Sequence, residues 1–152
     1  YNRGRFQQLF EQCIEQGQRS GDGFALVLLD VDHFKQVNDG WGHEVGDRAL
    51  RHLCKVLKRR LRKTDVIGRL GGEEFVLLVP NVTREGLNGV ATKIQQCVRE
   101  VLRRPDGQAV TVSIGGCMLN GHPERESWLH ESDACLYAAK DAGRDQIVIA
   151  AP

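Results

Sequence analysis

The feature that most constrains the fold is an uninterrupted apolar run with an acidic end, FALVLLDV at 24–31. It has the length of a strand, and its lack of polar alternation is typical of a central strand that is buried on both faces. A strand of this kind needs neighbouring strands beside it and layers packed above and below it. We therefore expect an α/β domain built around residues 24–31.

Periodic patterns on both sides of this run predict the remaining elements. Apolar residues at three- and four-residue steps predict helices at 3–19, 33–39 and 47–61, from a cap at Thr83 to before Pro105, and at 127–142. Short apolar runs predict strands at 66–70, 73–79, 109–119 and 146–150, and residues 40–46 are expected to form a loop. This order implies an α/β (α+β) fold with a ferredoxin-like mixed central sheet and helices packed around it.

Two glycine pairs have distinct structural meanings. Gly71 and Gly72 join two strand-like runs and predict a tight hairpin, because glycine adopts positive φ without a steric penalty. Gly115 and Gly116 lie inside a predicted strand, which indicates a bulge or a close approach of another backbone.

Length and composition exclude several classes of protein. The 152 residues suit one domain over 1–152, and the net charge of +1 does not favour nucleic acid bound by bulk charge. Five scattered cysteines without a CxxC pair suit a reducing compartment, and no HExxH pattern supports zinc. No apolar run approaches the roughly 20 residues of a membrane span. We expect a cytoplasmic domain that makes no membrane contact of its own.

Carboxylates gather at the predicted strand ends. Asp30 and Asp32 lie two apart and would point to the same side, whereas Glu73 and Glu74 directly follow the glycine turn and would point to opposite sides. Asp30 and one glutamate could together hold Mg²⁺, which prefers a few carboxylates plus phosphate oxygens. The alternative is that these acids are merely solvated.

Four motifs occur in order: DVDHFKQVND at 30–39, GHEVGD at 42–47, RLGGEEF at 69–75 and YAAKDAGR at 137–144. Together they resemble the GGDEF domains, the bacterial diguanylate cyclases, in their GGEEF variant. The resemblance covers nearly the whole chain. It implies a fold like the palm of nucleotidyl cyclases and polymerases. It also implies the condensation of two GTP into cyclic di-GMP and two pyrophosphates by a homodimer that uses Mg²⁺, with Mn²⁺ as the alternative ion.

The resemblance implies a role for each matching residue in the metal site. Asp30 and the backbone carbonyl of Val31 match metal ligands, and Glu73 matches a metal ligand that is also assigned as the base for the ribose 3′-hydroxyl. Glu74 would support the second metal ion. Gly71 and Gly72 would keep the turn free of side chains beside the nucleotide.

Substrate contacts are implied in the same way, and each has a structural alternative. Lys35 matches a lysine that steadies phosphate charge, or it is a surface lysine. Asn38 and Asp47 match the pair that binds guanine; otherwise Asn38 belongs to a helix stop and Asp47 is a helix N-cap. His43 matches a substrate contact or makes a structural hydrogen bond.

Three further residues match the nucleotide pocket. Phe34 occupies a lining position, although packing is its expected role, as it is for Trp41 and Tyr137. Lys140 and Arg144 match residues that reach the triphosphate; alternatively they only complement the dipole at a helix C-terminus.

A second site is implied by Arg62-Lys63-Thr64-Asp65, an RxxD motif five residues before GGEEF. In the family, this motif marks an inhibitory site for the product. Arg62 would grip a phosphate and guanine, and Asp65 would contact a base. The alternative is a local ion pair near a helix end.

The start of the chain departs from the family pattern, since only YNRGRF remains of its usual opening segment. We expect an upstream regulatory region to be absent, and that region could be membrane-bound. The rival to an enzyme is a binding module: a cyclic di-GMP receptor acting through Arg62 and Asp65, or a GTP sensor without turnover.

Overall fold

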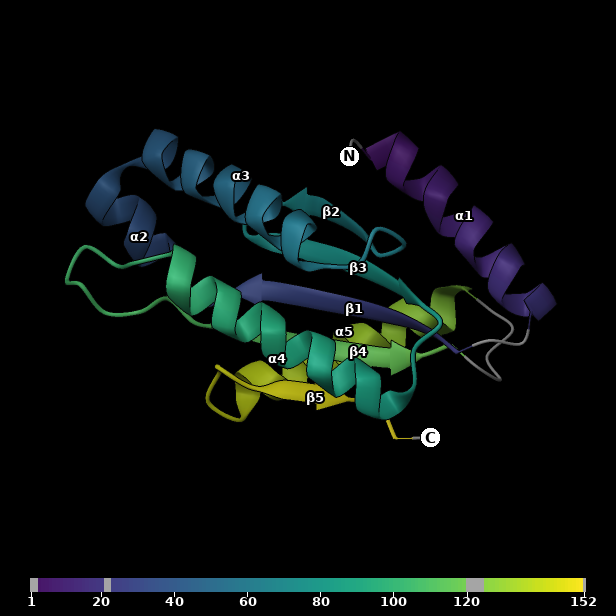
Figure 1. Cartoon of the computed structure of the whole chain (residues 1–152). Coiled ribbons are helices and arrows are strands. Elements are labelled where there is room, and N and C mark those ends of the chain that lie inside the picture. The colour runs from purple at the N-terminus through teal and green to yellow at the C-terminus, as the bar shows by residue number, and fades with distance from the viewer. Residues whose placement is uncertain (1–2, 21–22, 120–124, 152) are drawn as a thin grey trace.

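The central apolar run forms β1 (Phe24–Val31), and all eight of its residues are buried. In the computed structural model, which describes residues 3–20, 23–119 and 125–151, β1 is the middle strand of a five-stranded sheet (Figure 1). It pairs antiparallel with β3 (Glu74–Pro80) on one side and β4 (Val112–Met118) on the other. The prediction of a central strand covered on both faces is confirmed.

The edges of the sheet come from β2 (Val66–Gly71), antiparallel to β3, and β5 (Ile147–Ile149), parallel to β4. The strand order β2-β3-β1-β4-β5 contains the β2-β3-β1-β4 order of a ferredoxin-like sheet, extended by one parallel strand. The predicted ferredoxin-like mixed sheet is therefore confirmed.

In the part of the chain that the structure describes, five helices cover the sheet in two layers: α1 (Arg3–Ser20), α2 (Phe34–Trp41), α3 (His43–Arg60), α4 (Arg84–Val101) and α5 (Arg125–Asp141). Val27 and Leu29 of β1 belong to the core beneath α2, α3 and α4, whereas Leu26 and Leu28 belong to the core beneath α1 and α5. Figure 1 shows α4 in front of the sheet and α5 behind it. Successive side chains of a strand point to opposite faces of the sheet, so β1 contributes to both cores. Each fully buried leucine stabilises the fold by roughly 1.5–3 kcal/mol.

Local expectations are confirmed at two positions. Thr83 caps α4, because its Oγ1 accepts a hydrogen bond from the Gly86 backbone N–H at 3.0 Å. A Cβ on Gly115 would collide with the backbone of Ser132 and Leu136 in α5, so this glycine marks a close approach of helix to strand. Within the described ranges, no helix is both long and apolar enough to cross a membrane.

The expected loop at 40–46 is wrong. α2 continues to Trp41 and α3 begins at His43, so only Gly42, with φ of 89°, separates them. A single residue in the left-handed region turns the chain between two helices without a longer loop. The helix predicted to begin at residue 47 therefore begins four residues earlier.

Candidate active site

The acidic end of β1 lies beside the start of β3. Asp30 is 7% exposed and faces Glu74 across the strand pair. The Val31 backbone N–H donates a hydrogen bond to the Glu73 carbonyl oxygen at 3.2 Å, which ties the hairpin turn to the end of β1. Register therefore brings Asp30 and the two glutamates, which follow it by more than 40 residues in sequence, to one end of the sheet.

The hairpin turn is tight, as the glycine pair predicts. Gly71 pairs with Glu74, so Gly72 and Glu73 form the two-residue loop, and Gly72 has φ of 50°. Glu73 was expected to begin the second strand, but it lies in the turn and β3 begins at Glu74. Cβ atoms at Gly71 and Gly72 would meet nothing within 4 Å, so the space beside the turn is open.

Asp30 lies in an environment that disfavours its charge. Burial raises the pKa of this carboxyl, the hydrogen bond from Lys140 acts in the opposite direction, and the negative charges of Glu73 and Glu74 raise it further. The Lys140 Nζ donates to Asp30 Oδ2 at 2.5 Å. Excess negative charge around a buried carboxylate is the setting in which a cation is bound favourably.

The donor set fits an ion that is shared with phosphate. Among the described residues, no three His, Cys, Asp or Glu side chains gather closely enough to form a metal cage by themselves. Mg²⁺ does not require such a cage, because it is usually held by one or two carboxylates together with substrate phosphates and water. Asp30, the Val31 carbonyl, Glu73 and Glu74 can supply those oxygens.

α2 follows the acidic strand and carries three predicted substrate residues, Phe34, Lys35 and Asn38. It begins after His33, whose φ of 54° turns the chain out of β1. Phe34 is 3% exposed and packs in the core, as expected, whereas Lys35 is exposed at the start of the helix. The packing role expected for Trp41 and Tyr137 is wrong, since these side chains are 51% and 70% exposed.

Asn38 and Asp47 come from α2 and α3, which pack against each other. Asn38 Oδ1 lies against Gly46, where a Cβ would collide with it, and is buried without a hydrogen-bond partner in the described part of the chain. Neither structural alternative holds: α2 does not stop at Asn38, and Asp47 lies inside α3, whose N-cap is Gly42.

The Asp47 carboxylate is held by two arginines. Its Oδ1 accepts from Arg69 Nη1 at 2.7 Å, and its Oδ2 pairs with Arg51 Nη2 at 2.6 Å. The hydrogen bond from Arg69 lowers the pKa of Asp47 most, and burial opposes it. The charges of Arg51 and Arg69 and the hydrogen bond from Arg51 also lower this pKa, so it lies below its usual range. The two arginines therefore keep this carboxylate ionised and fix its orientation. An open pocket of about 460 Å³ beside it is lined by His43, Glu44, Asp47, Arg48 and Arg51.

Arg69 is a site residue that the sequence analysis missed. On β2, its Nε donates to the Gly72 carbonyl oxygen at 2.7 Å while its Nη1 reaches Asp47, so it connects the hairpin turn to α3. An arginine in an otherwise apolar strand, two residues before the glycine turn, is the signal that could have identified it.

Lys140 lies in the last turn of α5, and Arg144 follows three residues after the helix ends. Lys140 pairs with Asp30, so it does more than complement the helix dipole. Arg144 is exposed on the connection between α5 and β5, where it has φ of 67°. The structure thus brings the basic end of α5 to the acidic end of β1.

The RxxD residues form a local network away from these groups. Asp65 accepts hydrogen bonds from the backbone N–H of Arg62 at 2.9 Å and from its guanidinium at 3.1 Å. The guanidinium also donates to the carbonyl oxygens of Pro80 and Asn81. The Asp65 side chain is 1% exposed and that of Arg62 is 48% exposed, so only the arginine is open to a ligand in this conformation.

The family profile described as "Diguanylate cyclase, GGDEF domain" matches residues 1–146 of the chain. The chain belongs to this family of enzymes. Diguanylate cyclase DosC of Escherichia coli is 33% identical to this GGDEF domain over 149 residues, which are 96% of the chain and 32% of the relative. The chain thus spans about a third of the length of that relative.

Solved structures agree with the five-stranded fold. The GGDEF domain of DgcB from Caulobacter crescentus, in complex with c-di-GMP, superposes with a TM-score of 0.86 and 30% identity, covering 97% of this chain and 90% of that one. The active GGEEF domain of a diguanylate cyclase from Vibrio cholerae gives a TM-score of 0.84 and 27% identity, covering 93% and 91%.

Proposed function

We propose that this GGDEF domain is a diguanylate cyclase that joins two GTP molecules into cyclic di-GMP and releases two pyrophosphates. The observation that carries the proposal is the register that sets Asp30 opposite Glu74, with Glu73 in the adjoining turn. The family match and the c-di-GMP complex of the DgcB domain support the choice of nucleotide. We further propose that the domain works in the cytoplasm, within a longer protein.

Guanine recognition is assigned to Asn38 and Asp47. The buried Asn38 Oδ1 lacks a partner among the described residues, which is a costly state that a donor on the base would relieve. Asp47 is ionised and can accept from the N1–H and the exocyclic amine of guanine. His43 lines the neighbouring pocket. Phe34 is proposed to support the base site from the core, where it lies beside Gly46.

Phosphate binding is assigned to basic residues around the acidic centre. Lys35, Lys140 and Arg144 supply positive charge from α2 and from the end of α5. A divalent ion held by Asp30, the Val31 carbonyl, Glu73 and Glu74 supplies neutralisation of phosphate charge when bound; Mg²⁺ is proposed and Mn²⁺ is the alternative.

The same reaction forms each of the two phosphodiester bonds of the cyclic product. Glu73 takes the proton from a ribose 3′-hydroxyl, whose oxygen bonds to the α-phosphorus of the other GTP as the bond to pyrophosphate breaks. Because each protomer holds one GTP, two protomers must face each other. The open space beside Gly71 and Gly72 leaves room for the nucleotide along the turn.

Product inhibition is assigned to the GGEEF-linked RxxD motif. Arg62 is exposed enough to contact a phosphate or guanine of cyclic di-GMP. Contact with Asp65 requires its pair with Arg62 to open, because the carboxylate is covered in this conformation. Product binding that survives the Arg62→Ala and Asp65→Ala double variant would remove this assignment.

The deciding experiment incubates the chain with GTP and Mg²⁺ at low and high protein concentration, and also as a fusion to a dimerising helix. Cyclic di-GMP that rises more steeply than protein concentration is expected. Glu73→Ala in the fusion should abolish it, whereas Glu85→Ala, an exposed acid at the start of α4, should not. Absence of product from the wild-type fusion would reject the cyclase and favour a receptor.

A further inference from the structure

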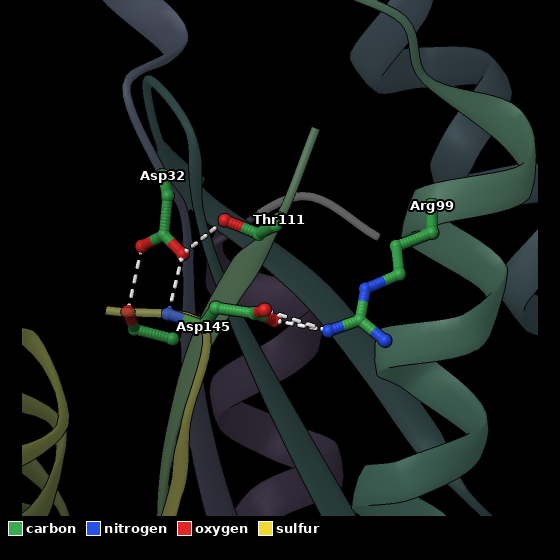
Figure 2. A network of polar contacts seen from close by, with 5 residues as sticks. Asp32, Arg99, Thr111 and Asp145 are labelled. Carbon is green, nitrogen blue, oxygen red and sulfur yellow. Dashed lines mark hydrogen bonds and ion pairs between the residues drawn. The ribbon is translucent and has the colours of Figure 1, made fainter. Parts of the chain in front are cut away.

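A second aspartate, Asp32, directly follows β1 and is not used by the proposed metal site. Its side chain is 5% exposed, and both carboxylate oxygens are occupied. Oδ1 accepts from Ser113 Oγ at 2.6 Å, while Oδ2 accepts from Thr111 Oγ1 at 2.8 Å and from the Asp145 backbone N–H at 3.0 Å (Figure 2). A buried carboxylate with three donors is fixed in place and has little capacity left for an ion.

Asp145 extends this contact to the opposite face of the sheet. Both of its carboxylate oxygens lie 2.7 Å from Nη2 of Arg99, which projects from α4. Figure 2 shows the chain of contacts from Asp32 through Asp145 to Arg99. The connection between α5 and β5 is therefore held through its backbone by Asp32, which follows β1, and through the Asp145 side chain by Arg99 of α4.

The held segment has an unfavourable backbone conformation. Arg144 and Asp145 have φ of 67° and 51°, so two consecutive residues with side chains lie in the left-handed region. Such residues persist only where the surrounding contacts impose the conformation. Arg144 is the first of the two, so the contacts at Asp145 also fix the point from which its side chain leaves the backbone.

We propose that Asp32, Asp145 and Arg99 are positioning residues that hold Arg144 at a set place relative to the acidic end of β1. Asp30 accepts a hydrogen bond from Lys140, and Asp32 accepts one from the Asp145 backbone N–H. The two aspartates thus hold the end of α5 and the segment after it at two points five residues apart. The inference rests on the proposed function, in which Arg144 contacts the triphosphate. None of the three residues touches the substrate in this assignment.

The test uses the outermost member, because Arg99 lies on α4 and its removal leaves the buried contacts of Asp32 intact. Arg60→Gln is the matched control: Arg60 and Arg99 side chains are 44% and 45% exposed, and each pairs with one acid at 2.7 Å. Binding of a non-hydrolysable GTP analogue with Mg²⁺ and the thermal midpoint are measured for wild type, Arg99→Gln, Arg60→Gln and Arg144→Ala.

Arg99→Gln is expected to weaken analogue binding about tenfold, because a displaced Arg144 makes a longer and less well aligned charge-assisted hydrogen bond to phosphate. Arg60→Gln should leave binding unchanged. In an Arg144→Ala background, Arg99→Gln should cause no further loss, since it acts through that residue. Asp32→Asn should show the same dependence on Arg144, whatever its effect on the thermal midpoint.

Equal losses with and without Arg144, or an equal loss in Arg60→Gln, would overturn the positioning role and leave Arg99 as a stabilising contact. These outcomes leave the cyclase intact, provided that wild type binds the analogue and makes cyclic di-GMP. A wild-type chain that does neither would overturn the proposed function and this inference with it.

Discussion

Two carboxylates on either side of the hairpin turn are held in opposite electrostatic environments. Asp30, at the end of β1, is buried beside two glutamates, and the pKa of its carboxyl is raised. Asp47, in α3, lies between Arg69 and Arg51, and its pKa is lowered. Only Asp30 lies among like charges, although Lys140 donates to it.

The difference corresponds to two kinds of ligand. Where buried carboxylates lie close together, a bound cation relieves the repulsion between their negative charges. A carboxylate that arginines keep ionised can instead accept hydrogen bonds from a neutral base. Arg69 joins the two regions, because it binds both Asp47 and the carbonyl of Gly72 in the turn that carries Glu73.

Asp30→Asn should have the largest effect. We expect a loss of cyclic di-GMP synthesis of about 100-fold or more, since even the outer partners of a metal ligand contribute 10- to 100-fold. The thermal midpoint should hold or rise, because the variant removes a buried charge that its neighbours disfavour. Asp133→Asn, at an exposed position of α5, is the control. Synthesis that persists in Asp30→Asn would end the assignment of the metal site.

Asp47→Asn should act on binding of the base. We expect the Kd for GTP to rise about 10- to 100-fold, because hydrogen bonds to a charged acceptor are lost. The preference for GTP over ATP should shrink, and the thermal midpoint should fall as Arg69 and Arg51 lose their partner. Calorimetric titration measures both affinities, and Glu100→Gln, which breaks the exposed Arg60 pair, is the control. An unchanged GTP preference would contradict the guanine assignment.

Arg69→Gln should reduce the difference between the environments of Asp30 and Asp47, with a smaller effect on GTP binding. The Kd for GTP should rise by less than about fivefold, since Arg51 still holds Asp47 and partly exposed ion pairs are weak. The pKa of Asp47 should move up toward its ordinary value, which NMR titration of the carboxyl carbon reports. Arg69→Lys keeps the positive charge but cannot contact Asp47 and the Gly72 carbonyl together. Compared with Arg69→Gln, it should bring the pKa of Asp47 closer to the wild-type value than it brings the Kd for GTP. A pKa unmoved by either variant would contradict the role of Arg69.

The smallest effect is on stability as a function of pH. Because the pKa of Asp30 is raised in the folded state, its contribution to stability is fully present below pH 3.8. That contribution is lost as pH rises through the pKa of the folded state. A lowered pKa at Asp47 has the opposite sign: its contribution is present above pH 3.8 and is lost as pH falls through the folded value. Thermal midpoints of wild type, Asp30→Asn and Asp47→Asn across acidic pH should therefore diverge in opposite directions. Parallel curves would show that the two environments do not differ.

Local rules predicted the elements better than their ends. The apolar run of β1, the glycine hairpin and the Thr83 cap all depend on neighbouring residues, and all three are present. The junction of α2 and α3 was missed, because one glycine with positive φ replaced the expected loop at 40–46. A sequence pattern does not reveal how few residues a turn will use.

The site was predicted only in part, because sequence patterns do not reveal contacts between distant residues. Motif resemblance identified Asp30, Glu73, Asn38 and Asp47, which the fold brings to neighbouring elements. It did not identify Arg69, Asp32 or Asp145, whose roles depend on partners 22 to 113 residues away along the chain.

The sequence by itself determined the order of strands and helices, the hairpin and the kinds of chemical group at the strand ends, because periodicity and turn preference are local properties. Only the tertiary structure decided which charge meets which: Lys140 with Asp30, Arg69 with Asp47, and Asp145 with both Asp32 and Arg99. The physical reason is that register and packing set these distances, and electrostatic energy depends on distance and burial rather than on position along the chain.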